Sequence, residues 1–451
     1  MLVDLLIKDG LIVTVDKSRQ IIAKGSIAIE DGRIIGVGKG LKLDEKPEEV
    51  LDASGKIVMP GLICSHTHLY AIFLRGMPIK TESISDLTQI LKQIWWQVDE
   101  VLTKEDAYTS ALFSCLEFIK TGTTTFADAF SAPNAITGVL DHIAQAVERS
   151  GIRGILSFEA TERRTHAEGS RGVRENERFI MKVKKRRSRL VRGMFSVHAS
   201  FTASDELLQY VRDLADRHKV PITIHVSEGF GDVYHNYEKF DKRTVERLSD
   251  IGFLGPDVVL AHCVRVNDSE LSLIKNARAK VAHNPLSNML NAVGIAPVAK
   301  MLSMEIPVGL GNDGYIFDGF ENIRAAFLLH KIANLDPRVI SPWEALEMAT
   351  IKGAELYGLE NELGSIEPGK LADLIIIDPA PSPTPVRAES VVRHILSTIN
   401  GNNVETVVVG GKIVMRDKKV LTLDEKEVVD SCRKSAEKIW QKIGVIKSAK
   451  R

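Results

Sequence analysis

The chain has 451 residues, of which 44% are hydrophobic and 26% are charged. These are ordinary globular values, so disorder is excluded as the dominant state. The 59 Lys and Arg residues are balanced by 59 Asp and Glu residues, which argues against the basic surface of a nucleic-acid-binding protein. Because an α/β barrel takes about 250 residues, the length suits one large domain with a smaller one.

The sequence shows no sign of a membrane span, a secretory leader or a disulfide framework. No apolar run approaches the roughly 20 residues that a membrane-spanning helix needs. The N-terminal segment lacks a basic start, and Asp4, Lys8 and Asp9 interrupt its apolar character, so we expect no signal peptide. The four cysteines are far apart and form no Cys-x-x-Cys pair. We therefore expect a cytoplasmic protein without disulfides, without a cysteine zinc site and without a membrane partner.

Both ends of the sequence have the pattern of short β-strands. Apolar and polar side chains alternate in segments of residues 5–61, with Asp-Gly and Lys-Gly turn signals between them. A similar pattern returns in residues 364–378 and 404–415. Neither flank alone has enough apolar surface for a core. We therefore predict one small β-sandwich domain built from residues 1–58 and 362–424, with two unrelated β extensions as the alternative.

Residues 59–361 have a different pattern, in which apolar β-branched runs alternate with amphipathic helical stretches. The eight candidate strands are residues 61–68, 122–129, 151–160, 192–199, 221–228, 258–264, 279–285 and 306–314. Helical periodicity is clearest in residues 104–122, 136–151, 204–219 and 320–332, and Ser204 is a favourable N-cap for the third of these. Eight such units predict an α/β protein with a (β/α)8 TIM barrel. An open doubly wound sheet is the structural alternative, but its usual Gly-x-Gly-x-x-Gly phosphate loop is missing.

Two basic stretches are interpreted as parts of helices. Residues 425–451 predict an amphipathic C-terminal helix that packs on the barrel. The basic run Lys184–Arg189 continues a helical pattern and precedes a strand. A solvated helix end explains that run, since a nucleic-acid patch would need wider support.

Nearly every predicted barrel strand ends in an imidazole or a carboxylate. These residues are His66, His68, Asp128, Glu159, His198, His225 with Glu228, His262, His283 and Asp313. The C-terminal ends of barrel strands converge on one mouth, where active sites lie, and two residues that are two apart on a strand face the same side. His66, His68, His225 and Asp313 therefore offer three imidazoles and one carboxylate to one cation. This set suits Zn²⁺ best, with Fe²⁺ or Mn²⁺ as alternatives.

The predicted site contains a single metal, because the fourth strand ends in His198 and offers no lysine for a second. Such a cation lowers the pKa of bound water to about 7 and supplies a hydroxide nucleophile. We expect Glu228 to shuttle protons, as a glutamate that is not a ligand does in zinc deaminases. His262 would hydrogen-bond the nucleophile, and Asp313 would accept the water proton. A loop glutamate, a buried histidine and a turn aspartate are the structural alternatives.

Five motifs carry a resemblance to a known family. They are PGLICSHTHLY (60–70), HVSE (225–228), AHC (261–263), HNPLSN (283–288) and GLGNDG (309–314). In this order and spacing they resemble the amidohydrolase superfamily, over nearly the whole chain. Within it the chain resembles the S-adenosylhomocysteine/methylthioadenosine deaminase and triazine chlorohydrolase group. Residues 94–103, 193–202 and 283–298 look closest to its SsnA-type aminohydrolases.

This resemblance implies a role for each matching residue. It implies that His66, His68, His225 and Asp313 hold the metal, that Glu228 and His262 act beside it, and that His198 and Asp99 bind substrate. Trp95 and Trp96 either line the pocket or pack a helix, and we expect packing for at least one of them. Analogy with similar barrels also makes a homodimer a possible assembly.

The expected activity is metal-dependent hydrolytic deamination of a small nitrogen heterocycle of the purine, pterin or pyrimidine type. A cyclic amide hydrolase or a triazine-type chlorohydrolase on the same site is the first alternative, and a non-catalytic interaction protein is the second. Substrate identity is open because the sequence departs from the adenosine-type deaminases in residues 199–203 and at Asn312, where threonine is usual. Their tail-binding arginine loop is not recognisable, although Arg163, Arg164 or Arg171 could replace it.

Overall fold

Eight parallel strands form a nearly closed barrel in the computed structural model, which describes residues 3–43, 46–79 and 84–447. In hydrogen-bonded order they are β6 (Leu62–Thr67), β7 (Thr123–Phe130), β8 (Arg153–Ala160), β10 (Phe195–Ala199), β11 (Ile222–Val226), β12 (Val258–His262), β13 (Lys280–His283) and β14 (Val308–Leu310). The short strand β9 (Val191–Gly193) pairs with β8. The chain after β14 returns to β6, where the Asn312 and Asp313 amides donate to the His66 carbonyl at 3.0 and 3.2 Å. Seven of the eight strands lie within the predicted runs, and β7 extends one residue beyond its run, which confirms the barrel.

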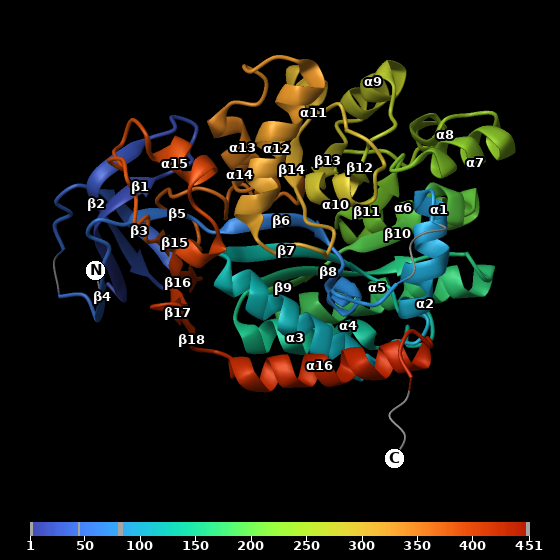
Figure 1. Ribbon diagram of the computed structural model, residues 1–451, viewed down its shortest axis with the longest axis horizontal. Helices are drawn as coiled ribbons and strands as arrows, with labels where there is room; N and C mark the ends of the chain where they lie inside the picture. The colour runs from blue at the N-terminus through green and yellow to red at the C-terminus, as the bar shows by residue number, and fades with distance from the viewer. Residues whose placement is uncertain (1–2, 44–45, 80–83, 448–451) are drawn as a thin grey trace.

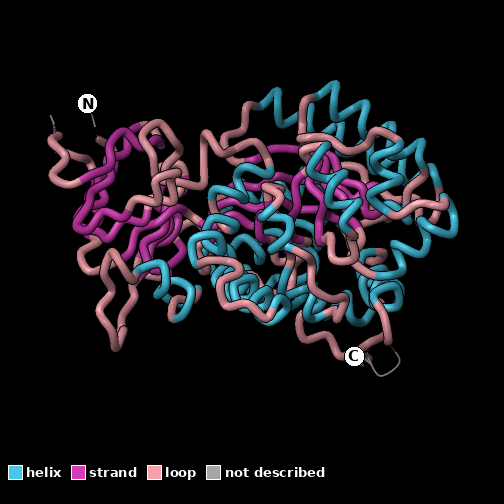
Figure 2. Tube along the Cα trace, turned by 90° about the horizontal axis from the view of Figure 1, so that it is seen from above, coloured by secondary structure: helices cyan, strands magenta, loops and turns pink. Residues whose placement is uncertain are grey.

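Helices surround this barrel, as two views show (Figures 1 and 2). Most of the outer layer consists of α3 (Lys104–Lys120), α4 (Val139–Ser150), α5 (His166–Arg186), α6 (Asp205–His218), α9 (Asp268–Asn276), α11 (Val298–Ser303), α12 (Gly319–Asn334), α13 (Pro342–Met348) and α14 (Ile351–Leu356). Because the barrel strands are covered on both faces, β7 and β8 are buried over their whole length. Helix α6 begins as predicted, since the Ser204 hydroxyl accepts a hydrogen bond from the Leu207 amide at 3.2 Å.

Shorter elements lie at the C-terminal ends of the strands. They are η1 (Leu69–Leu74), α1 (Leu87–Ile90), the π-helical turn η2 (Leu91–Trp95), α2 (Trp96–Asp99), η3 (Ser200–Thr202), α7 (Phe230–Phe240), α8 (Thr244–Asp250) and α10 (Pro285–Leu290). They occupy the loops that follow β6, β10, β11 and β13, so they border the mouth where the predicted site lies.

Strands from both chain ends form the second sheet, which is the smaller β domain seen on the left in Figure 1. Its order is β18 (Lys419–Val420), β17 (Lys412–Arg416), β16 (Val404–Val409), β15 (Leu374–Ile377), β5 (Ile57–Pro60), β1 (Leu5–Val13), β2 (Ile21–Glu30) and β3 (Arg33–Gly38), with β4 (Glu49–Asp52) beside β1. Strand β5 pairs with β1 on one side and with β15 on the other. The β3 end returns to residue 371, which precedes β15, so the sheet curls around its own apolar core. The prediction of one domain from two flanks is therefore confirmed.

A buried ion pair connects this domain to the barrel. Arg153, at the start of β8, donates to the Asp373 carboxylate at 2.6 and 2.9 Å. Asp373 precedes β15 and also accepts a hydrogen bond from the Gly410 amide at 2.7 Å. The two side chains are only 9% and 4% exposed. The contact thus fixes the β domain against the end of the barrel opposite the strand termini that carry the candidate site.

The C-terminal part contains η4 (Gly401–Asn403), α15 (Val391–Ser397) and α16 (Glu425–Lys442). Helix α16 runs along α3 (Figure 1), and its Trp440 indole donates to the Phe73 carbonyl in η1 at 2.8 Å. The helix is shorter than the predicted 425–451, because the chain turns at Gly444, where φ is 76°; residues 448–451 lie outside the described residues. The basic run from Lys184 ends α5 as expected.

All four cysteines are buried and unpaired. Among the described helices, none combines the length and the apolar character needed to cross a membrane.

Candidate active site

The four predicted metal ligands lie together at the mouth of the barrel. His66 and His68 come from the end of β6, His225 from β11, and Asp313 from the turn after β14. The His66 Nε2 and His68 Nε2 atoms lie 3.1 and 3.2 Å from Asp313 Oδ1, and His68 Nε2 lies 3.1 Å from His225 Nε2. One potential ligand atom from each residue lies within 4.8 Å of the others. The structure therefore brings together the whole predicted ligand set.

The hydrogen bonds of two imidazoles identify the atoms that are free to bind a cation. His68 Nδ1 donates to the Ala129 carbonyl and His225 Nδ1 donates to the His198 carbonyl, both at 2.6 Å. A carbonyl oxygen only accepts, so each neutral ring carries its proton on Nδ1 and a lone pair on Nε2. Two lone pairs that face each other at 3.1 Å require a positive charge between them, which either a metal ion or a proton supplies. The residues present thus fit a divalent metal with nitrogen and oxygen ligands.

The electrostatics of the site suit a cation at His66 and Asp313, and they favour a proton on His68 when no cation is bound. Burial lowers the pKa of His66 to about 4 and keeps it neutral, as a ligand must be. Burial also lowers the pKa of His68, but the charges of Glu159 and Asp313 more than offset it and raise the value to about 10, so a proton and a cation would compete for its Nε2. Burial opposes ionisation of Asp313, yet the imidazoles of His262, His66 and His68 hold its pKa well below the usual range.

Glu228 and His262 lie beside the predicted ligands. The Glu228 Oε2 and Asp313 Oδ1 atoms are 3.6 and 3.7 Å from His262 Nε2. His262 Nδ1 donates to the Asn288 side-chain oxygen at 2.8 Å, which orients the ring. Burial raises the pKa of Glu228 to about 7, where a carboxyl group both gives and takes protons readily at neutral pH. The cluster can therefore transfer protons next to a metal-activated water.

The backbone at this mouth is held in conformations that most residues avoid. Asp313 has φ 57° and His262 has φ 72°, and such values persist in non-glycine residues where the surrounding structure imposes them. Gly314 has φ 93°, and a Cβ there would lie 2.5 Å from the His68 carbonyl oxygen. A Cβ at Gly311 would lie 2.7 Å from the His66 carbonyl oxygen. The two glycines thus let the chain approach β6 closely enough to place Asp313 against both histidines.

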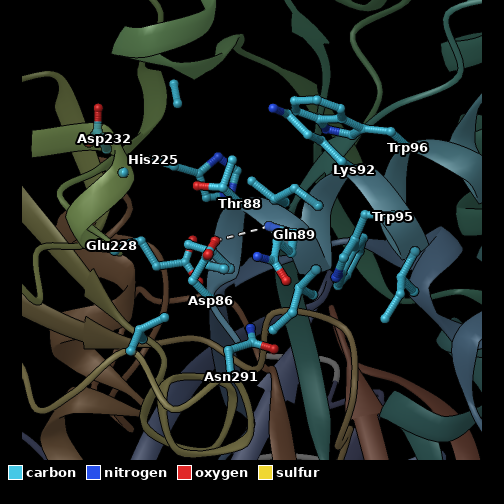
Figure 3. Close-up of a pocket in the computed structure, with 18 of the residues that line it drawn as sticks. Asp86, Thr88, Gln89, Lys92, Trp95, Trp96, His225, Glu228, Asp232 and Asn291 are labelled. Atoms are coloured by element: carbon cyan, nitrogen blue, oxygen red, sulfur yellow. Dashed lines mark hydrogen bonds between the residues drawn. The ribbon is translucent and has the colours of Figure 1, made fainter. Parts of the chain in front are cut away.

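A cavity of about 1040 Å³ opens over the predicted ligands. In Figure 3, His225 and Glu228 lie on one side of it, while Trp95 and Trp96 lie on the other. Residues 84–96 form a large part of its wall, and most of their lining side chains are apolar. A cavity of this size accommodates a molecule larger than a single heterocycle.

Both tryptophans line this cavity, although we expected packing for at least one. Trp95 is also buried in an aromatic cluster, with ring centroids 5.5 Å from those of His68 and Tyr315. Trp96 lies against the Arg163 guanidinium at 5.0 Å. Trp95 therefore combines the two expected roles.

His198 and Asp99, the predicted substrate-binding residues, also line the cavity. Burial and the Arg163 charge lower the pKa of His198 to about 3, so its ring is neutral. Asp99 is 1% exposed, and its two oxygens accept hydrogen bonds from Arg163 at 2.5 Å and Ser131 at 2.8 Å. Asp99 thus already has two protein donors.

Sequence reasoning did not assign roles to three residues that support the ligands. The Ser287 hydroxyl donates to Asp313 Oδ2 at 2.5 Å, so the second oxygen of this carboxylate already has a donor. Asn288 orients His262, and Glu159 lies near the Nδ1 atoms of two ligands. Ser287 and Asn288 lie in the quoted 283–288 motif, and Glu159 ends a predicted strand, but only the three-dimensional arrangement shows what each contacts.

Comparison with known proteins agrees with this site. Residues 57–414 match the sequence model of the Amidohydrolase family. The chain belongs to the amidohydrolase family. It is 38% identical over 439 residues to a 5'-deoxyadenosine deaminase of Methanobrevibacter smithii, covering 96% of this chain and 98% of that protein. It is 36% identical over 416 residues to a 5-methylthioadenosine/S-adenosylhomocysteine deaminase of Thermococcus sibiricus, with coverages of 91% and 94%.

Solved structures share the fold of this amidohydrolase. A zinc-bound adenosine deaminase from Xanthomonas campestris superposes with a TM-score of 0.88 at 23% identity, covering 97% of this chain and 98% of that one. A zinc-bound atrazine chlorohydrolase from Arthrobacter aurescens gives a TM-score of 0.83 at 22% identity, with coverages of 96% and 100%. The comparisons and the site identify the chain as a hydrolase that acts on C–N bonds, and as an aminohydrolase of small heterocyclic molecules.

Proposed function

We propose that the chain is a zinc-dependent deaminase of adenine nucleosides whose 5′ position carries a small uncharged group. The observation that carries this proposal is the Glu228–His262–Asp313 cluster next to three imidazoles, at the bottom of a cavity larger than a nucleobase. The names of the relatives support the choice of an adenine nucleoside, since they act on 5'-deoxyadenosine and on 5-methylthioadenosine or S-adenosylhomocysteine.

The three arginines that follow β8 support the choice of an uncharged 5′ group. Arg163 is paired with Asp99 at 2.5 Å, and Arg164 with Glu168 at 2.6 Å. Arg171 is exposed on α5. None of these three guanidiniums is thus available to pair with the carboxylate of an amino-acid tail. Lys92 and Arg265 also line the cavity, and Arg265 stacks on the Phe230 ring at 4.0 Å. We therefore expect S-adenosylhomocysteine to be a poorer substrate than a nucleoside with an uncharged 5′ group.

The proposed reaction replaces the exocyclic amine by oxygen. When bound, the metal would lower the pKa of a water molecule to about 7 and so supply the nucleophile. Glu228 takes a proton from this water and delivers it to the ring nitrogen next to the amine-bearing carbon. His262 hydrogen-bonds the oxygen that adds to the ring carbon, and Asp313 relays the second water proton to the leaving amine. The C–N bond then breaks, and ammonia leaves.

A substrate panel with ammonia release as readout tests the proposal. Adenosine, 5′-deoxyadenosine, 5′-methylthioadenosine, S-adenosylhomocysteine, guanine and atrazine would each be incubated with protein of measured zinc content. We expect ammonia from the nucleosides with uncharged 5′ groups, at a kcat/KM at least tenfold above that for S-adenosylhomocysteine. Chloride release from atrazine without ammonia from any purine would support the chlorohydrolase alternative instead.

Several finer assignments belong to the same proposal. We keep zinc as the metal, with His66, His68, His225 and Asp313 as ligands, and we keep the cytoplasm as the location. The division into residues 1–58 with 362–424, residues 59–361 and residues 425–451 is proposed from the sequence pattern. A homodimer without nucleic-acid partners remains a prediction, to be checked by light scattering.

A further inference from the structure

Glu159 is a buried carboxylate for which the proposed reaction has no step. It ends β8, which lies between β7 and β10 in the barrel. Its side chain is 3% exposed, and its Oε1 lies 3.8 Å from His68 Nδ1 and 3.5 Å from His225 Nδ1. These nitrogens are the ring atoms opposite the Nε2 atoms that face the metal position. Glu159 therefore lies behind two ligands at once.

The position of Glu159 would be costly without a partner of positive charge. Within the described part of the chain, its Oε1 accepts no hydrogen bond, and a buried carboxylate without compensation is strongly unfavourable. Both neighbouring Nδ1–H groups already donate to main-chain carbonyls. The Arg163 guanidinium, the basic group near this site, is paired with Asp99. The groups that lie next to Oε1, and through which a compensating charge can act on it, are therefore the two imidazoles.

The charges of the site supply this compensation when a divalent cation is present. Three neutral imidazoles and the Asp313 carboxylate leave one positive charge of the cation without a balance. A second carboxylate behind the ligands restores neutrality. It also draws the Nδ1–H dipoles of His68 and His225 toward itself, which makes their Nε2 atoms better donors to the metal.

We propose that Glu159 is a positioning residue for the metal, whose negative charge polarises His68 and His225 and balances the bound dication. The inference rests on the proposed metal site and not on the proposed substrate. Glu159 thus increases the affinity of the site for Zn²⁺ without binding the ion.

Zinc affinity of the full-length protein tests this role. Zn²⁺ binding would be measured by competition with a chromophoric chelator at pH 7.5 for the wild type, Glu159→Gln and Glu159→Asp. Glutamine keeps the shape and removes the charge, so we expect Kd to rise about 10- to 100-fold. Aspartate keeps the charge but holds it farther from the two imidazoles, so we expect its Kd for Zn²⁺ to lie between those of the wild type and Glu159→Gln. If Glu159→Gln does not fold, Glu159→Asp alone still has to bind zinc more weakly than the wild type.

Asp232→Asn provides the matched control. Asp232 is also buried and lines the same cavity, but its carboxylate is held by Ser200, Ser227 and Asn236 and contacts no ligand imidazole. We expect its zinc affinity to equal that of the wild type. In ¹⁵N-histidine-labelled, zinc-loaded protein, the Nδ1–H resonances of His68 and His225 should shift upfield in Glu159→Gln and stay unchanged in the control.

Two results would overturn the proposal. One is an unchanged zinc affinity in Glu159→Gln, and if KM rises at the same time, Glu159 contacts substrate instead. The other is two zinc ions per wild-type chain. A wild-type protein that binds zinc normally but releases no ammonia would contradict the proposed function and leave the role of Glu159 intact.

Discussion

Replacing Glu228 by glutamine removes the proposed proton shuttle but keeps the size and the hydrogen-bonding capacity of the side chain. The side chain is 12% exposed, its Oε2 lies 3.6 Å from His262 Nε2, and its neighbour Asn291 can hydrogen-bond an amide as well as a carboxylate. The fold and the zinc site should therefore survive in Glu228→Gln. A positioned general acid–base contributes about 10²- to 10⁴-fold to a rate, which corresponds to about 3–5 kcal/mol of the barrier. We expect kcat to fall by that factor while KM and zinc content stay close to the wild-type values.

The pH profile gives this prediction a second readout. Burial raises the pKa of Glu228 to about 7, and the group must be ionised before it can take a proton from water. The wild-type kcat/KM should therefore rise with pH up to about 7 and level off above it. Glu228→Gln should lose this acidic limb, because glutamine does not titrate.

Steady-state ammonia release between pH 5 and 9 measures both effects. Asp86→Asn is the matched control, because Asp86 lines the same cavity (Figure 3) but serves as the N-cap of α1, a role that asparagine fills equally well. Its kcat and its pH profile should match those of the wild type. A Glu228→Gln enzyme within tenfold of the wild-type kcat, or one that keeps the acidic limb, would refute the assigned role.

Three further predictions concern the metal and stability. Chelation should abolish ammonia release and lower the melting temperature, since a ligand at 1,000 times its Kd stabilises the folded state by about 4 kcal/mol; readdition of zinc should restore both. Burial raises the pKa of Asp232 from 3.8 to about 6, so ionisation of this carboxyl opposes folding. As pH rises from 4 to 6, the free energy of unfolding of the metal-free wild type should therefore fall by up to about 3 kcal/mol relative to that of Asp232→Asn. If urea unfolding shows the same difference between the two proteins at both pH values, the prediction is wrong. Arg153→Met leaves the Asp373 carboxylate buried, with a hydrogen bond from the Gly410 amide but without its cation. Urea unfolding should therefore show that the free energy of unfolding falls by about 3–5 kcal/mol. A fall of less than about 1 kcal/mol would mean that water replaces the guanidinium.

The sequence predicted the barrel well because its signals are local. Each strand is a short run of apolar and small side chains that is buried on both faces, and each ligand stands at or just after the end of such a run. The spacing of His66 and His68 placed both on one side of the chain at the end of β6. The barrel brings the C-terminal ends of its strands to one mouth, which places His225 and Asp313 next to them. The ligand set could thus be assembled without knowing any distance.

The supporting contacts could not be predicted in this way. Glu159 reaches His68 and His225 only because β8 lies between β7 and β10, and no local pattern encodes which side chain lies behind which ring. The pairing of Asp99 with Arg163 joins residues 64 positions apart. The shorter C-terminal helix depends on the turn at Gly444, a local feature that the amphipathic pattern obscured.

The placement of β5 between β1 and β15 has a consequence for biosynthesis. Strand β5 enters the sheet within the first 60 residues, but its second neighbour leaves the ribosome only after more than 300 further residues have been made. Until then one edge of the nascent sheet has open backbone hydrogen-bonding groups, whereas the barrel strands can already associate in chain order. The barrel is therefore expected to fold first during translation, and the exposed N-terminal strands are the part of the nascent chain that most needs protection from aggregation.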